Sequence, residues 1–176
     1  MKYFLLIILG GVIMGIAFWF KNKPAPMIYD RGDAIKNYIL LKDDGTSIET
    51  DNFRGKWLVL YFYPKDDTPG CTKEAQTYSS LIDEFKHLET EIFGINTNSP
   101  ESHQKFKQKY SLNVNLLTDE KKVAIKDFSV RTIGGFCSRD TVLINPEGKL
   151  EETYRGVNPA GSPVEILEYI KTHSSP

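Results

Sequence analysis

Of the two cysteines in the sequence, Cys71 lies where a nucleophilic thiolate is favoured. Thr68 is a suitable N-cap residue and Pro69 suits the first position of a helix, so the spacing predicts a helix that begins here. Cys71 then falls in the first turn, where unpaired N–H groups and the helix dipole stabilise negative charge. An ordinary cysteine, with a pKa near 8.5, is only about 3% ionised at pH 7. The position makes Cys71 a candidate nucleophile rather than an inert core residue.

The residues after Cys71 exclude two kinds of cysteine chemistry. A thioredoxin-type redox pair needs a second cysteine three positions later, and that position is Glu74. A copper-carrying variant needs a cysteine four positions later, and that position is Ala75. Because the chain has only two cysteines, a disulfide-stapled scaffold and a four-cysteine zinc site are also excluded. The sequence around Cys71 therefore predicts a single reactive thiolate without a neighbouring cysteine.

The elements around this segment predict an α/β domain with a mixed central sheet flanked by helices. The apolar run 57–63, closed by Pro64, is typical of a strand buried on both faces. A helix with an apolar stripe at Tyr78, Leu81, Ile82 and Phe85 follows. The other predicted strands are 38–41, 47–49, 91–96, 115–117, 141–144 and 150–155, and the other predicted helices are 99–110, 121–128 and 164–169. Cys71 lies just beyond the central strand, at the edge where open α/β sheets place their sites.

The composition fits one globular core. The chain has 176 residues, of which 40% are hydrophobic and 26% charged, so disorder and fibrous repeats are excluded. Its 22 basic residues nearly balance its 23 acidic residues, and this balance disfavours a nucleic-acid partner.

Residues 4–20 form an uncharged apolar run with lysines on both sides. At about 1.5 Å per residue the run approaches the thickness of a bilayer core. It exceeds the usual hydrophobic region of a signal peptide, which favours a retained anchor over a cleaved signal. We therefore predict a transmembrane helix or signal anchor over 1–23, a linker over 24–27, and the folded domain over 28–176. The flanking lysines do not decide the orientation; by analogy with signal anchors that have short leading tails, we expect the domain to be exported across the cell membrane.

Two segments resemble the motifs of a known family. The segment YFYPKDDTPGCTKEA, residues 61–75, resembles the active-site motif of the peroxiredoxins, specifically of the PrxQ or bacterioferritin-comigratory-protein subfamily. It contains the pattern Pro-x-x-x-Thr-x-x-Cys as Pro64, Thr68 and Cys71. The segment RDTVLI, residues 139–144, resembles a second motif in which an arginine opens a strand. The resemblance implies a thioredoxin-like fold and the reduction of hydrogen peroxide and organic hydroperoxides without metal or haem.

The resemblance also implies a role for each motif residue. Cys71 would attack the terminal peroxide oxygen and become a sulfenic acid. Arg139 would stabilise the thiolate and the charge that moves onto the leaving oxygen. Thr68 would place its hydroxyl against the peroxide while it caps the helix, and Pro64 would shield the intermediate from water. Glu74 is expected to hold Arg139.

The chain departs from the subfamily at one informative position. Many members carry a resolving cysteine five residues after the first, where this chain has Gln76. The sulfenic acid must then be reduced by Cys137 of the same chain, by Cys137 of another chain, or by an external thiol such as thioredoxin, glutaredoxin or glutathione. We expect an external thiol and no other cofactor. Cys137 lies in the glycine-containing segment 133–137, which we expect to be a loop that can move, so a Cys71–Cys137 disulfide and a spectator role are both open.

Two other functions are compatible with the sequence. The loss of the usual resolving cysteine admits a membrane-tethered binding or chaperone module without peroxidase turnover. A membrane-anchored thiol–disulfide reductase is the second alternative, which the absence of a paired cysteine near Cys71 disfavours. The presence of Pro64, Thr68, Cys71 and Arg139 together favours the peroxidase. We expect the protein to be a monomer or a weak dimer.

Overall fold

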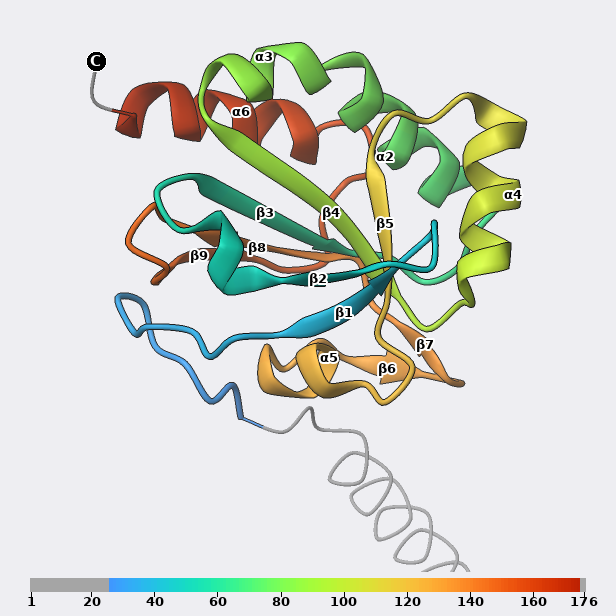
Figure 1. The fold of residues 1–176 in the computed structure, drawn as a ribbon, viewed down its shortest axis with the longest axis horizontal. Helices are drawn as coiled ribbons and strands as arrows, with labels where there is room; N and C mark the ends of the chain where they lie inside the picture. Colours follow the sequence, from blue (N-terminus) through green and yellow to red (C-terminus); the bar gives the residue numbers. More distant parts are fainter. Residues whose placement is uncertain (1–25, 175–176) are drawn as a thin grey trace, which may run out of the picture.

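The computed structural model describes residues 26–174 (Figure 1). Within this range seven strands form one mixed sheet in the order β2-β1-β5-β4-β3-β8-β9, and β6 and β7 form a separate two-stranded sheet. The strands are β1 (Ile39–Lys42), β2 (Ser47–Glu49), β3 (Trp57–Phe62), β4 (Thr90–Asn96), β5 (Asn115–Thr118), β6 (Thr132–Ile133), β7 (Phe136–Cys137), β8 (Asp140–Ile144) and β9 (Leu150–Tyr154). The helices are the 3₁₀ helix η1 (Thr50–Phe53), α2 (Pro69–Ser80), α3 (Ile82–His87), α4 (Pro100–Tyr110), α5 (Val123–Asp127) and α6 (Ser162–His173). The predicted mixed sheet with flanking helices is confirmed.

Strand β3 lies inside the sheet and is buried on both faces, as its apolar run predicted. Leu58, Leu60 and Phe62 belong to the hydrophobic cluster on the side of α5. Val59 and Tyr61 belong to the cluster that contains side chains of α2, α4 and α6. Figure 1 shows the same division, with α2, α3, α4 and α6 on one side of the sheet and α5 on the other. Because successive side chains of a strand point to opposite faces, one strand connects both cores.

The sheet register brings two distant segments together at the carboxyl end of β3. Strand β8 runs antiparallel to β3, with Phe62 opposite Asp140. The start of β8 therefore lies beside the end of β3. Arg139, which precedes β8, and the segment after β3, which leads to Cys71, meet at this edge of the sheet.

The predicted single helix with the stripe 78–85 is interrupted at Leu81. Thr77 and Ser80 each donate a side-chain hydrogen bond to a backbone carbonyl one turn earlier, at 2.8 Å in both cases. Such bonds compete with the helical pattern, so α2 ends and α3 begins after a one-residue break. Tyr78 and Phe85 are still fully buried on either side of the break. The expectation of one continuous helix was wrong, whereas the packing of these two rings was predicted.

The predicted membrane segment, residues 4–20, lies outside the described residues. Among residues 26–174, no helix is both long enough and apolar enough to cross a bilayer.

Candidate active site

Cys71 is the third residue of α2, in the first helical turn. Pro69 occupies the first helical position, and Thr68 has the extended backbone of an N-cap residue, as predicted. The backbone N–H of Thr72 donates to the carbonyl oxygen of Thr68 at 2.8 Å and closes the first turn. The Cys71 side chain is only 1% exposed. The nucleophile predicted from the sequence therefore lies under the protein surface, at the amino end of a helix.

The Thr68 side chain does not cap α2, which corrects the sequence expectation. Its Oγ1 instead donates a 3.1 Å hydrogen bond to the carbonyl oxygen of Lys65 in the preceding loop. The hydroxyl oxygen keeps lone pairs that can accept a further hydrogen bond. Pro64 follows the end of β3, where its missing N–H cannot extend the strand. The roles predicted for Thr68 and Pro64 toward the peroxide stay predictions.

Arg139 connects Cys71 to Glu74. Its Nη1 donates to Oε2 of Glu74, and its Nη2 donates to Sγ of Cys71 at 3.5 Å. Glu74 is fully buried, and the Arg139 side chain is 16% exposed. Cys71 and Glu74 are three positions apart on α2, so they share one face of the helix. The structure thus brings together the three residues that the sequence analysis expected to act together.

Burial and charge oppose each other at this pair. Burial raises the pKa of Glu74 to about 7, although Arg139 acts to lower it. Burial alone would lower the pKa of Arg139, but Glu74 and the Cys71 sulfur raise it. The second carboxyl oxygen of Glu74, Oε1, accepts no hydrogen bond from any residue that the structure describes. The ion pair is therefore held at a cost in desolvation.

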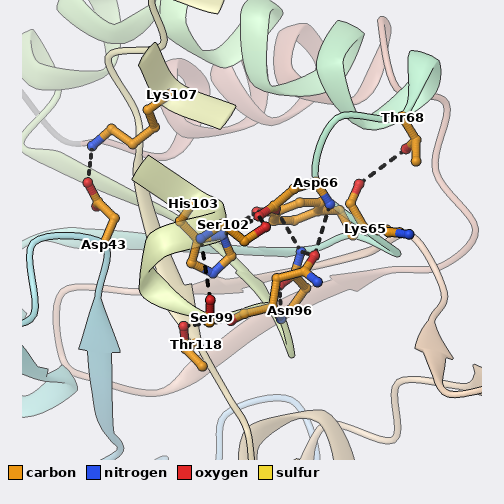
Figure 2. A network of polar contacts seen from close by, with 12 residues as sticks. Asp43, Lys65, Asp66, Thr68, Asn96, Ser99, Ser102, His103, Lys107 and Thr118 are labelled. Atoms are coloured by element: carbon orange, nitrogen blue, oxygen red, sulfur yellow. Dashed lines mark hydrogen bonds and ion pairs between the residues drawn. The ribbon is translucent and has the colours of Figure 1, made fainter. Parts of the chain in front are cut away.

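The loop between β3 and α2 is attached to α4 through Asp66, a contact that the sequence analysis missed (Figure 2). The Asp66 carboxylate accepts hydrogen bonds from Tyr63 Oη at 2.7 Å, Ser102 Oγ at 2.6 Å and Asn96 Nδ2 at 3.1 Å. His103 Nδ1 lies 2.9 Å from its Oδ2. Burial alone would raise the pKa of Asp66, but His103, Ser102 and Tyr63 lower it below the usual value. Since the carboxylate accepts, Nδ1 is the protonated ring nitrogen.

Asp67, the next residue, binds the other end of the same helix. Its carboxylate accepts from Lys109 Nζ at 2.7 Å and from Tyr110 Oη at 2.6 Å. Asp67 has a φ of 56°, a left-handed conformation that aspartate tolerates better than most residues. The two aspartates hold the loop that precedes Cys71 against both ends of α4.

A signal for the buried histidine was present in the sequence. His103 lies three residues before Phe106, an apolar residue of the predicted helix 99–110, so both side chains share one face of the helix. Both are buried, at 0% and 2% exposure. The polar character of the helix concealed the position of His103.

Cys137 is a free, buried thiol at the end of β7. Its Sγ donates to the carbonyl oxygen of Tyr63 at 2.9 Å. Burial raises the pKa of the Cys137 thiol to about 12. The segment 133–137, which was expected to be a loop, is part of the β-hairpin formed by β6 and β7. In the part of the chain that the structure describes, no three His, Cys, Asp or Glu residues are grouped so as to hold a metal ion.

Replacing each loop aspartate in turn tests the attachment to α4. We expect Asp66→Asn to lower the free energy of unfolding by roughly 3 kcal/mol, because the amide replaces one of the two acceptor oxygens with an NH2 group that faces other donors. Asp67→Asn is the matched control, since its exposed carboxylate is solvated and should contribute little. Urea denaturation measures both. Equal losses in the two variants would contradict a specific role for the buried contacts of Asp66.

The pKa of Glu74 predicts a pH-dependent cost. The folded state raises this pKa from 4.5 to about 7, so folding favours the protonated form. The contribution of protonated Glu74 to the free energy of unfolding is fully present below pH 4.5 and is lost as the pH rises through 7. Relative to Glu74→Gln, the wild type should therefore lose up to about 3 kcal/mol of unfolding free energy between pH 4.5 and 8. The exposed Glu84→Gln variant is the control, and a wild-type minus Glu74→Gln difference that stays constant with pH would refute the shift.

The chain matches known proteins in sequence and in structure. Residues 31–153 match the AhpC/TSA family. The chain is 36% identical over 157 residues to peroxiredoxin Bcp of Bacillus subtilis, an alignment that covers 84% of this chain and 99% of that protein.

Two solved structures share the fold over most of the chain. A cysteine-to-serine mutant of Xylella fastidiosa PrxQ superposes with a TM-score of 0.80 at 28% identity, covering 85% of this chain and 100% of the other. The bacterioferritin comigratory protein of Xanthomonas campestris, studied for its alkyl peroxide reduction activity, has a TM-score of 0.76 at 30% identity and covers the same 85% and 100%. The protein therefore has a thioredoxin-like fold, belongs to the AhpC/TSA family, and is a thiol peroxidase of the Bcp and PrxQ type.

Proposed function

We propose that this protein reduces hydrogen peroxide and organic hydroperoxides in a one-cysteine cycle, with an external thiol as the reductant. The observation that carries the proposal is the contact between Arg139 Nη2 and Cys71 Sγ, with the guanidinium held by the buried Glu74. This places a fixed positive charge where the sulfur meets the peroxide.

The first half of the cycle oxidises Cys71. The sulfur, as thiolate, attacks the terminal oxygen of the hydroperoxide, a sulfur–oxygen bond forms and the oxygen–oxygen bond breaks. The products are a sulfenic acid on Cys71 and an alkoxide or hydroxide, which takes a proton from water to leave as alcohol or water. Arg139 stabilises the negative charge as it moves onto the leaving oxygen.

Gly70 leaves the space that the guanidinium occupies. A Cβ atom added to Gly70 would lie 3.0 Å from Arg139 Nη2, closer than most such contacts. An alanine here would require the guanidinium to move by a few tenths of an ångström. The glycine before the nucleophile therefore serves the same contact.

The second half of the cycle uses a thiol from outside the chain. Gln76 occupies the usual position of a resolving cysteine. Cys137 is a poor substitute, because its pKa of about 12 keeps it protonated near neutral pH and its proton is donated to a backbone carbonyl. We therefore assign the reduction to thioredoxin, glutaredoxin or glutathione, and a spectator role to Cys137.

We also propose that residues 4–20 anchor the protein in the cell membrane, with the peroxidase domain on the exported side. The uncharged run and its flanking lysines support the anchor, and the orientation rests on the analogy with signal-anchor proteins. The reductant would then have to act on the exported side, because the cytosolic thioredoxin pool cannot reach it.

Intact-mass measurement tests the cycle directly. The reduced full chain should gain one oxygen atom within about a second of adding one equivalent of hydrogen peroxide, far faster than uncatalysed disulfide rearrangement. Cys137→Ser should gain the same oxygen, and Cys71→Ser should gain none. The loss of two hydrogens in the wild-type monomer would show a Cys71–Cys137 disulfide and contradict the external thiol. An unchanged wild-type mass would contradict the peroxidase cycle itself.

A further inference from the structure

The β6–β7 hairpin projects from the domain next to the active site. It forms a two-stranded sheet of its own, in which Ile133 pairs with Phe136. Gly134 and Gly135 between them have φ angles of 58° and 90°, as a tight hairpin turn requires. A Cβ atom added to either glycine would meet nothing within 4 Å. The tip of the hairpin therefore points into open space.

Two large apolar side chains flank this tip. Ile133 is 66% exposed and Phe136 is 47% exposed. Scattered exposed hydrophobic residues are ordinary in soluble domains, so exposure alone indicates nothing. What distinguishes Ile133 and Phe136 is their position beside the catalytic residues.

The hairpin is connected to the catalytic loop. Cys137, the last residue of β7, donates through Sγ to the carbonyl oxygen of Tyr63 at 2.9 Å. Lys65 Nζ lies 5.8 Å from the centroid of the Phe136 ring. Arg139, which contacts the Cys71 sulfur, follows the hairpin by two residues. The exposed apolar pair is therefore held beside the loop that leads to the nucleophile.

Basic side chains lie next to Ile133 and Phe136. Lys65 lies over the ring of Phe136, and Lys122 Nζ donates to the carbonyl oxygen of Gly135 at 3.4 Å. The side chain of Arg131, just before β6, is exposed as well. An apolar centre with basic neighbours fits a partner surface that has an apolar centre and acidic neighbours.

From these contacts we infer that the tip of the β6–β7 hairpin is the docking site for the protein thiol that reduces the Cys71 sulfenic acid. The inference deepens the proposed function and rests on it, because a cycle without an internal resolving cysteine needs a partner beside the site. The partner is a thiol–disulfide oxidoreductase with an apolar surface and acidic side chains around its reactive cysteine.

The docked partner completes the cycle in two balanced steps. Its thiol attacks the Cys71 sulfenic acid, which forms a mixed disulfide and releases water. Its second thiol then attacks the mixed disulfide, so that the partner leaves as a disulfide and Cys71 returns to the thiol. Because the Cys71 side chain is 1% exposed, the partner must stay bound while the first turn of α2 opens to admit it.

The test compares protein thiols with small thiols on the full-length enzyme. Reduced thioredoxin and glutaredoxin are the protein probes, and dithiothreitol and glutathione are the small ones. For the double variant Ile133→Ala, Phe136→Ala, we expect the second-order rate constant with the better protein probe to fall about tenfold. Oxidation by hydrogen peroxide and reduction by dithiothreitol should stay within about twofold of the wild type. Val164→Ala, on α6, truncates an apolar side chain of similar exposure (46%) and should change neither rate.

A charge variant adds a second readout. Lys122 also contacts Gly135, so the salt dependence of the rate, rather than the rate alone, distinguishes a lost charge from a disturbed hairpin. Lys122→Glu should slow reduction by the protein probe at low salt, and the effect should shrink as added salt screens the charge. Lys86→Glu, on α3, is the matched control.

The outcomes separate the two proposals. Failure of hydrogen peroxide to oxidise Cys71 overturns the proposed function and, with it, the docking site. Normal oxidation with wild-type rates for the double variant overturns the docking site alone. Equal slowing with protein and small thiols also overturns it, because the hairpin then acts through the active site. Reduction of the wild type by small thiols only has the same consequence.

Discussion

The catalytic arrangement depends on the buried ion pair between Glu74 and Arg139. A guanidinium on a flexible side chain would sample many positions, but this one is fixed by a carboxylate on the same helix face as Cys71. The pair is expensive, because Glu74 is fully buried and its second oxygen accepts no hydrogen bond from the described residues. A buried charge that opposes stability but lies next to a nucleophile is typical of a functional site, where it orients the reactive groups.

The rest of the fold holds this ion pair next to the Cys71 sulfur. The antiparallel pairing of β8 with β3 delivers Arg139 to the end of the central strand. Asp66 and Asp67 hold the intervening loop to α4, so the start of α2 has fixed supports on one side. Gly70 leaves room for the guanidinium. Long-range pairing, loop attachment and local space therefore converge on one contact of 3.5 Å between Arg139 and Cys71.

Features determined by neighbouring residues could be predicted from the sequence. The apolar run of β3 and the Thr-Pro start of α2 are local patterns, and they located Cys71 correctly in the first helical turn. The proximity of Arg139 came from the resemblance to a known motif rather than from any local pattern.

Features that depend on distant partners could not be predicted in this way. The Asp66–His103 contact joins residues far apart in the chain, and no local pattern pairs them. The hydroxyl of Thr68 binds the Lys65 carbonyl because of how the loop folds back, which its N-cap propensity does not reveal. The helix break at Leu81 arises from competing side-chain hydrogen bonds, whereas the apolar stripe alone indicated a continuous helix.

The second-order rate constant for oxidation of Cys71 by hydrogen peroxide, measured for Arg139→Lys by stopped flow, tests the central claim most directly. Lysine keeps the positive charge but lacks the planar fork that contacts Glu74 and the sulfur at once. The structure predicts that the rate constant falls by about 100-fold or more, with the oxidation product unchanged. A rate constant within about twofold of the wild type would show that the fixed guanidinium is not what makes Cys71 reactive.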